Sequence, residues 1–182
     1  MRKILATAAF GMIGAMGLPG TSFAADPLGF MLRASSKSAD KEATLVEFVV
    51  HNNSQQEVSL ARNIVVANDF AFGDIIVNVT DVVAKKRLPF GCFVDRGPVA
   101  RYTYLAAGAE FIVRSDLSSC FQISRHVARS YRITAVFRPK TLPCFCGTSH
   151  PCEVVKHCFP VEVEARPIVL RMRAKTSKQS DE

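Results

Sequence analysis

Cysteine and histidine are the residue types in this sequence best suited to chemistry, and most of them fall in one short stretch. Four of the six cysteines lie within fifteen residues of one another, together with two of the four histidines: Cys144, Cys146, His150, Cys152, His157 and Cys158. Cys92 and Cys120 stand apart. In an exported protein, an even number of cysteines is typical of disulfide bonding. We therefore expect one bridge between Cys92 and Cys120, and two bridges among the cysteines of segment 139–160, in any of three connectivities.

The same cluster supports a second interpretation, a metal site. Thiolate sulfur and imidazole nitrogen are ligands that suit zinc and copper(I), and the two histidines are interspersed among the cysteines. The alternative ligand set is Cys144, Cys146, His150, Cys152, His157 and Cys158. Because an oxidising compartment consumes thiolates as disulfides, we expect no metal and no other cofactor.

No arrangement of side chains in the sequence predicts catalysis. Ser149 and His150 are adjacent, but the Gly-x-Ser-x-Gly turn that exposes a nucleophilic serine is missing around them. Cys144 and Cys146 form a Cys-x-Cys pair rather than the Cys-x-x-Cys of thiol oxidoreductases. We therefore expect a protein that is not an enzyme.

The first residues have the composition of a secretory signal peptide. Arg2 and Lys3 supply its positive start, residues 4–18 its uncharged apolar centre, and Ser22 and Ala24 the small residues that signal peptidase requires. We expect residues 1–24 to be removed and the mature chain to be periplasmic or secreted. Because no second apolar run of about 20 residues follows, no transmembrane segment is expected.

The charge is moderately basic. The 182 residues include 23 basic and 16 acidic side chains, and removal of the signal peptide leaves 21 basic ones. A basic exported protein can associate with anionic envelope surfaces or with acidic partners. No basic helix with interleaved aromatic residues occurs, so we expect no nucleic-acid partner. Residues 175–182 are expected to form a flexible polar tail.

The segments that must position the cysteines alternate between apolar and polar residues, which is typical of strands with one buried face. The clearest alternating rows lie at 46–50, 75–79, 131–137 and 161–165. Helical periodicity is missing from the mature chain, apart from a weak signal near Ser118–Ala128. Eight or nine short strands predict an all-β fold: a single immunoglobulin-like antiparallel β-sandwich over residues 25–174, with the Cys-rich loop 139–160 inside it.

Several short segments follow one another in the order found in a known family. They are Phe48-Val49-Val50-His51-Asn52, Lys86-Arg87-Leu88-Pro89-Phe90-Gly91, Asp95-Arg96-Gly97-Pro98, Tyr104-Leu105-Ala106-Ala107-Gly108, Asp116-Leu117-Ser118 and Tyr131-Arg132-Ile133. Over residues 45–137 the chain resembles the immunoglobulin-like, non-catalytic N-terminal domain of deuterolysin-like (peptidyl-Lys) metalloendopeptidases. We expect the Tyr131 region to form a tyrosine corner. The family's His-Glu-x-x-His zinc motif is missing, so no catalytic residue is carried over and protease activity is not expected.

These expectations favour a protein-binding domain. An exported sandwich without catalytic residues acts by presenting loops or an edge strand to another protein. We expect the contact surface in the disulfide-bonded loop, at Phe145, His150, His157 and Phe159, with both phenylalanines exposed. Together with the resemblance, this predicts that the partner is another exported protein, and that the domain inhibits or accompanies a peptidase by steric occlusion. Two alternatives stay open: a periplasmic zinc- or copper-binding protein, and a structural envelope protein.

Overall fold

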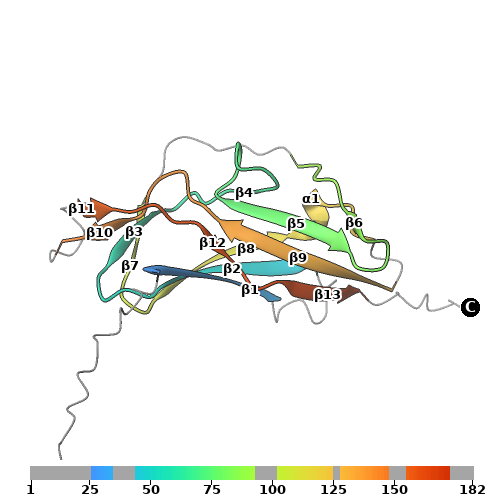
Figure 1. The fold of residues 1–182 in the computed structure, drawn as a ribbon, viewed down its shortest axis with the longest axis horizontal. Helices are drawn as coiled ribbons and strands as arrows, with labels where there is room; N and C mark the ends of the chain where they lie inside the picture. Colours follow the sequence, from blue (N-terminus) through green and yellow to red (C-terminus); the bar gives the residue numbers. More distant parts are fainter. Residues whose placement is uncertain (1–25, 35–43, 93–101, 125–127, 148–154, 173–182) are drawn as a thin grey trace, which may run out of the picture.

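The computed structural model shows a chain built mainly from short strands (Figure 1). It describes residues 26–34, 44–92, 102–124, 128–147 and 155–172; the predicted signal peptide and polar tail lie outside these ranges. The strands are β1 (Leu28–Ala34), β2 (Leu45–Asn52), β3 (Val58–Ala61), β4 (Val66–Ala67), β5 (Ile75–Asp81), β6 (Lys86–Arg87), β7 (Tyr102–Leu105), β8 (Glu110–Asp116), β9 (Arg129–Phe137), β10 (Cys144–Cys146), β11 (Val155–Cys158), β12 (Val163–Glu164) and β13 (Ile168–Met172). One helical turn, α1 (Leu117–Cys120), follows β8. No helix within these ranges is long and apolar enough to cross a membrane.

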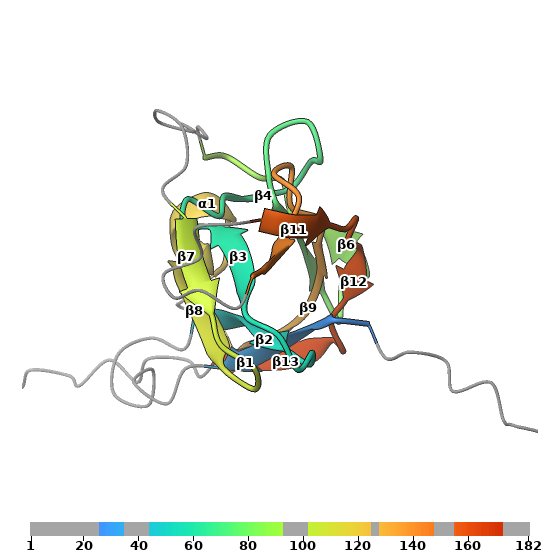
Figure 2. The same ribbon diagram turned by 90° about the vertical axis from the view of Figure 1, so that its left-hand side faces the viewer.

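The strands form two layers around one core (Figure 2). The first layer contains the sheet β1-β2-β8 and its continuation β11-β10-β3-β7. Because β2 pairs with β8 and β3 with β7, residues 45–61 run antiparallel to residues 102–116. In the second layer β9 and β5 are central; β12 and β13 pair with β9, and β4 and β6 pair with β5. The described pairs are antiparallel except for the two-residue pair β4–β5.

The predicted alternation of apolar residues builds the core. Four inward-facing side chains of β9 are at most 1% exposed: Tyr131, Ile133, Ala135 and Phe137. The ring centroids of Phe30 on β1 and Phe137 on β9 lie 5.6 Å apart, so these rings join the two layers. On one side of the molecule β1 also lies beside β12 and β13. These contacts confirm the predicted all-β sandwich.

A tyrosine at the start of β9 fixes the chain that leads into it. The phenol oxygen of Tyr131 accepts a hydrogen bond from the backbone N–H of Ser124 at 3.0 Å, seven residues upstream. The Tyr131 side chain is 1% exposed, so the polar tip of a buried ring finds its partner in the backbone. This contact serves the purpose expected of a tyrosine corner, which pins the segment entering a strand.

The predicted bridge between Cys92 and Cys120 is present and fastens one end of the sandwich. Cys92 follows β6 of the second layer, and Cys120 ends α1, which follows β8 of the first layer. The rings of Phe90 and Phe121 pack beside the bridge with centroids 5.3 Å apart. Within the described residues, the weak helical signal near Ser118–Ala128 corresponds to α1 alone, since the chain is already extended at Phe121; residues 125–127 lie outside the described ranges.

Candidate functional site

The segment predicted as a Cys-rich loop contains a β-hairpin that extends the first layer. β10 pairs with β11 on one side and with β3 on the other, so the hairpin belongs to the sheet. Cys144 and Cys158 lie opposite each other in this register and form a disulfide, with a Cα–Cα distance of 3.9 Å. The hydroxyl of Ser59 on β3 donates to the carbonyl of Cys144 at 3.2 Å. We call the unit β10–β11 with its disulfide the stapled hairpin.

The cysteines of the stapled hairpin are oxidised. Cys146 is disulfide-bonded as well, and the part of the chain that the structure describes contains no free cysteine. Cys152 and His150 lie outside the described residues. The metal alternative required thiolates from Cys144, Cys146 and Cys158, and their sulfur atoms are engaged in disulfides instead. Among the described residues, no group of three His, Cys, Asp or Glu side chains is arranged to hold a metal.

The two phenylalanines of the predicted contact surface are less exposed than expected. Phe159 is 8% exposed and belongs to the core, and its ring centroid lies 4.6 Å from that of Phe145. Phe145 is half-buried because it lies opposite the core residue Val58 of β3 and faces inward with it. The expectation that both rings are exposed is therefore wrong. His157 is exposed beside Phe145 in the hairpin register.

Exposed apolar side chains instead gather on two connections near the stapled hairpin. The loop 68–74 between β4 and β5 carries Phe70, 39% exposed, and Phe72, 57% exposed, and the connection between β9 and β10 carries Leu142, 48% exposed. In Figure 1 both connections lie on the upper side of the molecule, between the stapled hairpin at the left and β5. We define the Phe70 patch as Phe70, Phe72, Arg138, Lys140 and Leu142. Its aromatic residues occur in the sequence Phe70-Ala71-Phe72-Gly73, which lies outside the predicted contact surface.

Asp74 holds the two connections of the Phe70 patch together. Its carboxylate accepts hydrogen bonds from the backbone N–H groups of Val65 at 3.0 Å and Lys140 at 2.8 Å. Its carbonyl accepts from the N–H of Arg138 at 2.8 Å. Asp74 is 7% exposed, so these bonds form largely away from water, where a lost partner is costly. The patch is therefore a fixed surface rather than two independent loops.

The loop itself is closed by short contacts. The carboxylate of Asp69 accepts from the N–H of Ala71 at 2.7 Å, and the carbonyl of Asp69 accepts from the N–H of Gly73 at 3.0 Å. At Gly73 a Cβ atom would lie only 2.8 Å from the Cβ of Ala67, so this close approach requires glycine. Because folding already fixes this aromatic loop, little conformational entropy is left for it to lose on binding a partner.

The apolar side chains of the Phe70 patch are accompanied by positive charge. The guanidinium carbon of Arg138 lies 5.0 Å from the centroid of the Phe70 ring, within cation–π range. The ammonium group of Lys140 donates to the carbonyl of Ala71. Phe70, Arg138, Pro139 and Lys140 line an open hollow of about 490 Å³. The nearby carboxylate of Glu162 lies 3.5 Å from Arg138 and offsets part of this charge.

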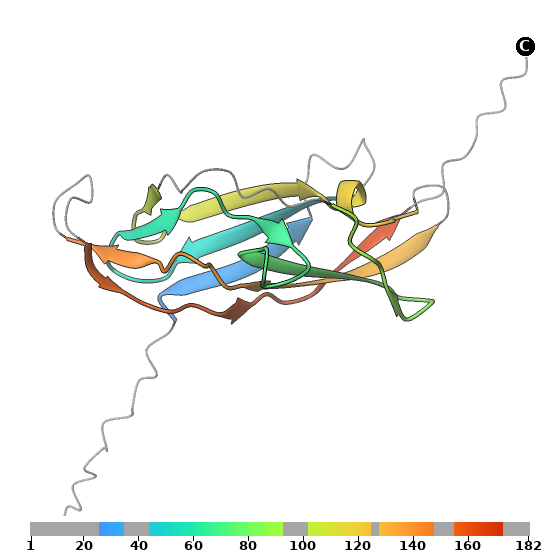
Figure 3. The ribbon, with the colours of Figure 1, turned by 90° about the horizontal axis from the view of Figure 1, so that it is seen from above.

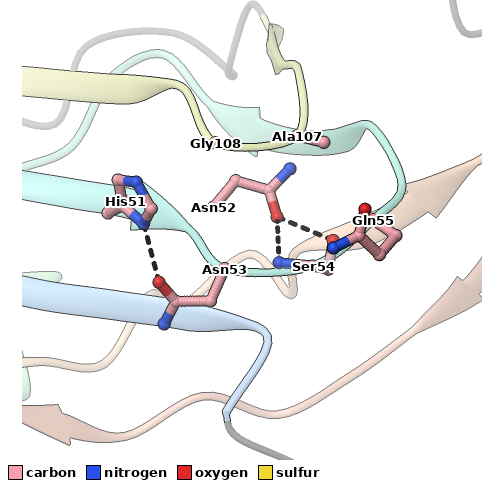
Figure 4. A pocket seen from close by; sticks show the side chains of 7 residues that line it. All are labelled: His51, Asn52, Asn53, Ser54, Gln55, Ala107 and Gly108. Carbon is pink, nitrogen blue, oxygen red and sulfur yellow. Dashed lines mark hydrogen bonds between the residues drawn. The ribbon is translucent and has the colours of Figure 1, made fainter.

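A second hollow, of about 360 Å³, surrounds Asn52 and has a structural role (Figure 4). Asn52 is fully buried, and its amide nitrogen donates to the carbonyls of Gln56 at 2.7 Å and Leu105 at 2.8 Å. Its amide oxygen accepts from the N–H of Ser54 at 3.0 Å and from its hydroxyl at 2.7 Å. The Ser54 hydroxyl thus bonds Asn52, whereas the ring of His51 bonds Asn53 at 2.6 Å. This wall holds no serine–histidine pair, and the amide group of Asn52 is engaged in hydrogen bonds within the fold.

Ion pairs cover the outer face of β1, β2 and β8. Arg33 and Glu110 form a bidentate pair with N–O distances of 2.6 and 3.0 Å. In the strand register they flank the row containing Val49, which is fully buried although it faces away from the core. The Arg33 hydrogen bond lowers the pKa of Glu110, and the same bond raises the pKa of Arg33. Because the Arg33 guanidinium and the Glu110 carboxylate are bonded to each other, we assign this face a structural role.

The structure therefore defines a disulfide-bonded all-β sandwich with one fixed aromatic and basic surface, the Phe70 patch. No protein-family model matches the chain, and no curated protein matches it in sequence.

Proposed function

We propose that this protein is an exported, non-catalytic protein-binding domain that contacts its partner through the Phe70 patch. The observation that carries the proposal is the exposure of Phe70 and Phe72 on a loop held in one conformation. Aromatic side chains and arginine dominate the energetics of protein interfaces, and a preformed surface loses little entropy on association. The disulfides support export, because such bonds are typical of oxidising compartments.

The chemistry of the patch indicates the kind of partner. Arg138 and Lys140 favour an acidic segment, and the exposed faces of Phe70, Phe72 and Leu142 favour apolar side chains within it. The resemblance to a domain that precedes a peptidase makes an exported peptidase the first partner to test. On such an enzyme the domain would act by steric occlusion, with the rigid stapled hairpin beside the contact.

Site-specific photo-crosslinking in the exporting host tests this proposal. A benzophenone amino acid replaces Phe72 in one variant and Tyr104 in a matched control, because Tyr104 is an exposed aromatic residue on β7 of the other layer, 41% exposed. We expect a discrete covalent adduct from position 72 and none from position 104. Equal adducts at both positions, or none at position 72, would contradict the proposal and favour a structural envelope role.

A second substitution in the Phe72 crosslinking variant tests the charge argument. Lys140→Glu should reduce the adduct, and Arg62→Glu, at an exposed arginine outside the patch, should leave it unchanged. If the captured partner is a peptidase, adding the purified domain in equal amount should inhibit cleavage of a protein substrate. Full peptidase activity in the saturated complex would exclude occlusion.

A further inference from the structure

A second exposed apolar feature lies at the turn between β5 and β6. Val83 is 82% exposed and its neighbour Val82 is 44% exposed. In Figure 3 this turn, drawn in green, projects beyond the body of the sandwich. No hollow described above includes these valines, so they form a convex tip rather than the wall of a pocket.

The conformation of this tip is fixed by Asp81. Its carboxylate accepts hydrogen bonds from the N–H groups of Val83 and Ala84, both at 2.9 Å. The N–H of Val82 donates to the carbonyl of Ser130 on β9 at 2.9 Å. The valines are therefore held outward by the fold, and their exposure is not a consequence of fraying.

Basic side chains surround the tip. Lys85, Lys86 and Arg87 follow it directly and are exposed. Across the outer face of the second layer, Thr80 lies between Arg87 and the exposed Arg132. Residues opposite each other on adjacent strands share a face. The Cα atoms of Arg87 and Arg132 are therefore about 10 Å apart, which is two strand spacings.

The positive charge at this end is not neutralised by the acidic residues packed beside it. Asp81 is 2% exposed, and its carboxylate is bonded to Arg129 at 2.8 Å. Glu164 lies opposite Val136, four residues along β9 from Arg132. Lys85, Lys86, Arg87 and Arg132 thus concentrate exposed positive charge at this end of the second layer, which is the charge pattern that attracts an anionic partner.

We infer that the β5–β6 turn docks this protein on an anionic lipid bilayer. Val82 and Val83 enter the boundary between headgroups and acyl chains, and Lys85, Lys86, Arg87 and Arg132 lie against lipid phosphates. A bilayer fits better than an acidic protein, because a convex aliphatic tip beside bases matches the interface of a membrane. In Figure 1 this turn and the stapled hairpin lie at opposite ends, so docking leaves the hairpin directed away from the membrane. The inference goes beyond the proposed function and does not depend on it.

Co-sedimentation of the mature protein with vesicles tests the inference. Vesicles of phosphatidylcholine alone are compared with vesicles in which about a third of the lipid is phosphatidylglycerol. We expect binding only to the anionic vesicles, weakening as salt is raised. The combined substitution Lys86→Gln, Arg87→Gln and Arg132→Gln should weaken binding about 100-fold, and Val83→Ser about threefold to tenfold.

Matched control variants separate the contribution of the tip to vesicle binding from that of net charge. The combination Arg33→Gln, Arg62→Gln and Arg114→Gln removes the same number of charges elsewhere, and Met31→Ser removes an exposed apolar residue elsewhere. In these variants vesicle binding should weaken by no more than about twofold, because charges far from the membrane surface are screened by salt and contribute little. Equal binding to neutral vesicles, no binding to anionic vesicles, or equal losses in the tip and control variants would each overturn the inference.

Discussion

Replacing Asn52 with alanine should destabilise the fold by about 3–5 kcal/mol. The amide nitrogen of Asn52 donates to Gln56 and Leu105, and each such bond contributes about 1 kcal/mol net. The Leu105 carbonyl is buried, so losing its donor adds a desolvation penalty of about 1–3 kcal/mol. Ser54 loses the Asn52 oxygen as its acceptor, but it can bond to water instead, so this loss adds little to the destabilisation. The free energy of unfolding is measured by urea titration with the disulfides intact.

Two companion variants make this prediction specific. Asn53→Ala removes an exposed neighbouring amide whose hydrogen bonds to His51 and Asp26 are open to water, and it should change stability by no more than about 1 kcal/mol. Asn52→Asp keeps the acceptor for Ser54 but replaces the donor with a second oxygen that faces the carbonyls of Gln56, Leu105 and Ala106. At neutral pH it should destabilise at least as much as Asn52→Ala.

Lowering the pH toward 4 should narrow the gap between Asn52→Asp and the wild type, because the protonated acid can donate one bond again. A loss below about 1 kcal/mol for Asn52→Ala, or equal losses at Asn52 and Asn53, would refute the reasoning.

Three further substitutions test separate parts of the fold. The pKa of Asp81 is lowered by the hydrogen bonds from Ala84 and Val83 and by its arginine partner, so its stabilisation is complete above the ordinary value of about 4 and is lost below it. Asp81→Asn should therefore lower Tm at neutral pH, with the difference from wild type shrinking below about pH 4 in Tm measurements against pH. Replacing Cys92 and Cys120 by serine opens a loop with a sequence separation of 28, and should cost about 3–4 kcal/mol in urea titrations. Gly73→Ala should cost about 1–3 kcal/mol, whereas Gly91→Ala, which meets no atom closer than 3.8 Å, should be neutral.

The strands could be predicted because alternation is a local property. Tyr131, Ile133 and Phe137 recur with a period of two, and each residue lies in the core as that period predicts. The pairing of Cys92 with Cys120 was also predictable, because the other four cysteines cluster together. Pairing within that cluster was not, since it depends on a hairpin register with an irregularity between Phe145 and Cys146.

The candidate surface was harder to predict, because exposure in irregular segments depends on distant parts of the chain. Phe159 lies between Cys158 and Pro160, outside the alternating rows, yet it packs on Phe145 and the core. Phe70 lies in a segment without periodicity, and its position follows from Asp74, which bonds the backbone of Lys140, 66 residues away. The local sequence Phe72-Gly73-Asp74 is typical of a turn, but it carries no information about that distant partner.

The most direct test of the central claim is the affinity of the crosslinked partner, once purified, for two double variants. Phe70→Ser with Phe72→Ser removes the aromatic part of the Phe70 patch, and Tyr102→Ser with Tyr104→Ser removes two exposed aromatic residues elsewhere. Calorimetric titration should show at least about tenfold weaker binding for the first variant and unchanged binding for the second, with similar unfolding midpoints. Unchanged binding by the phenylalanine variant, or a larger loss in the tyrosine variant, would contradict the account.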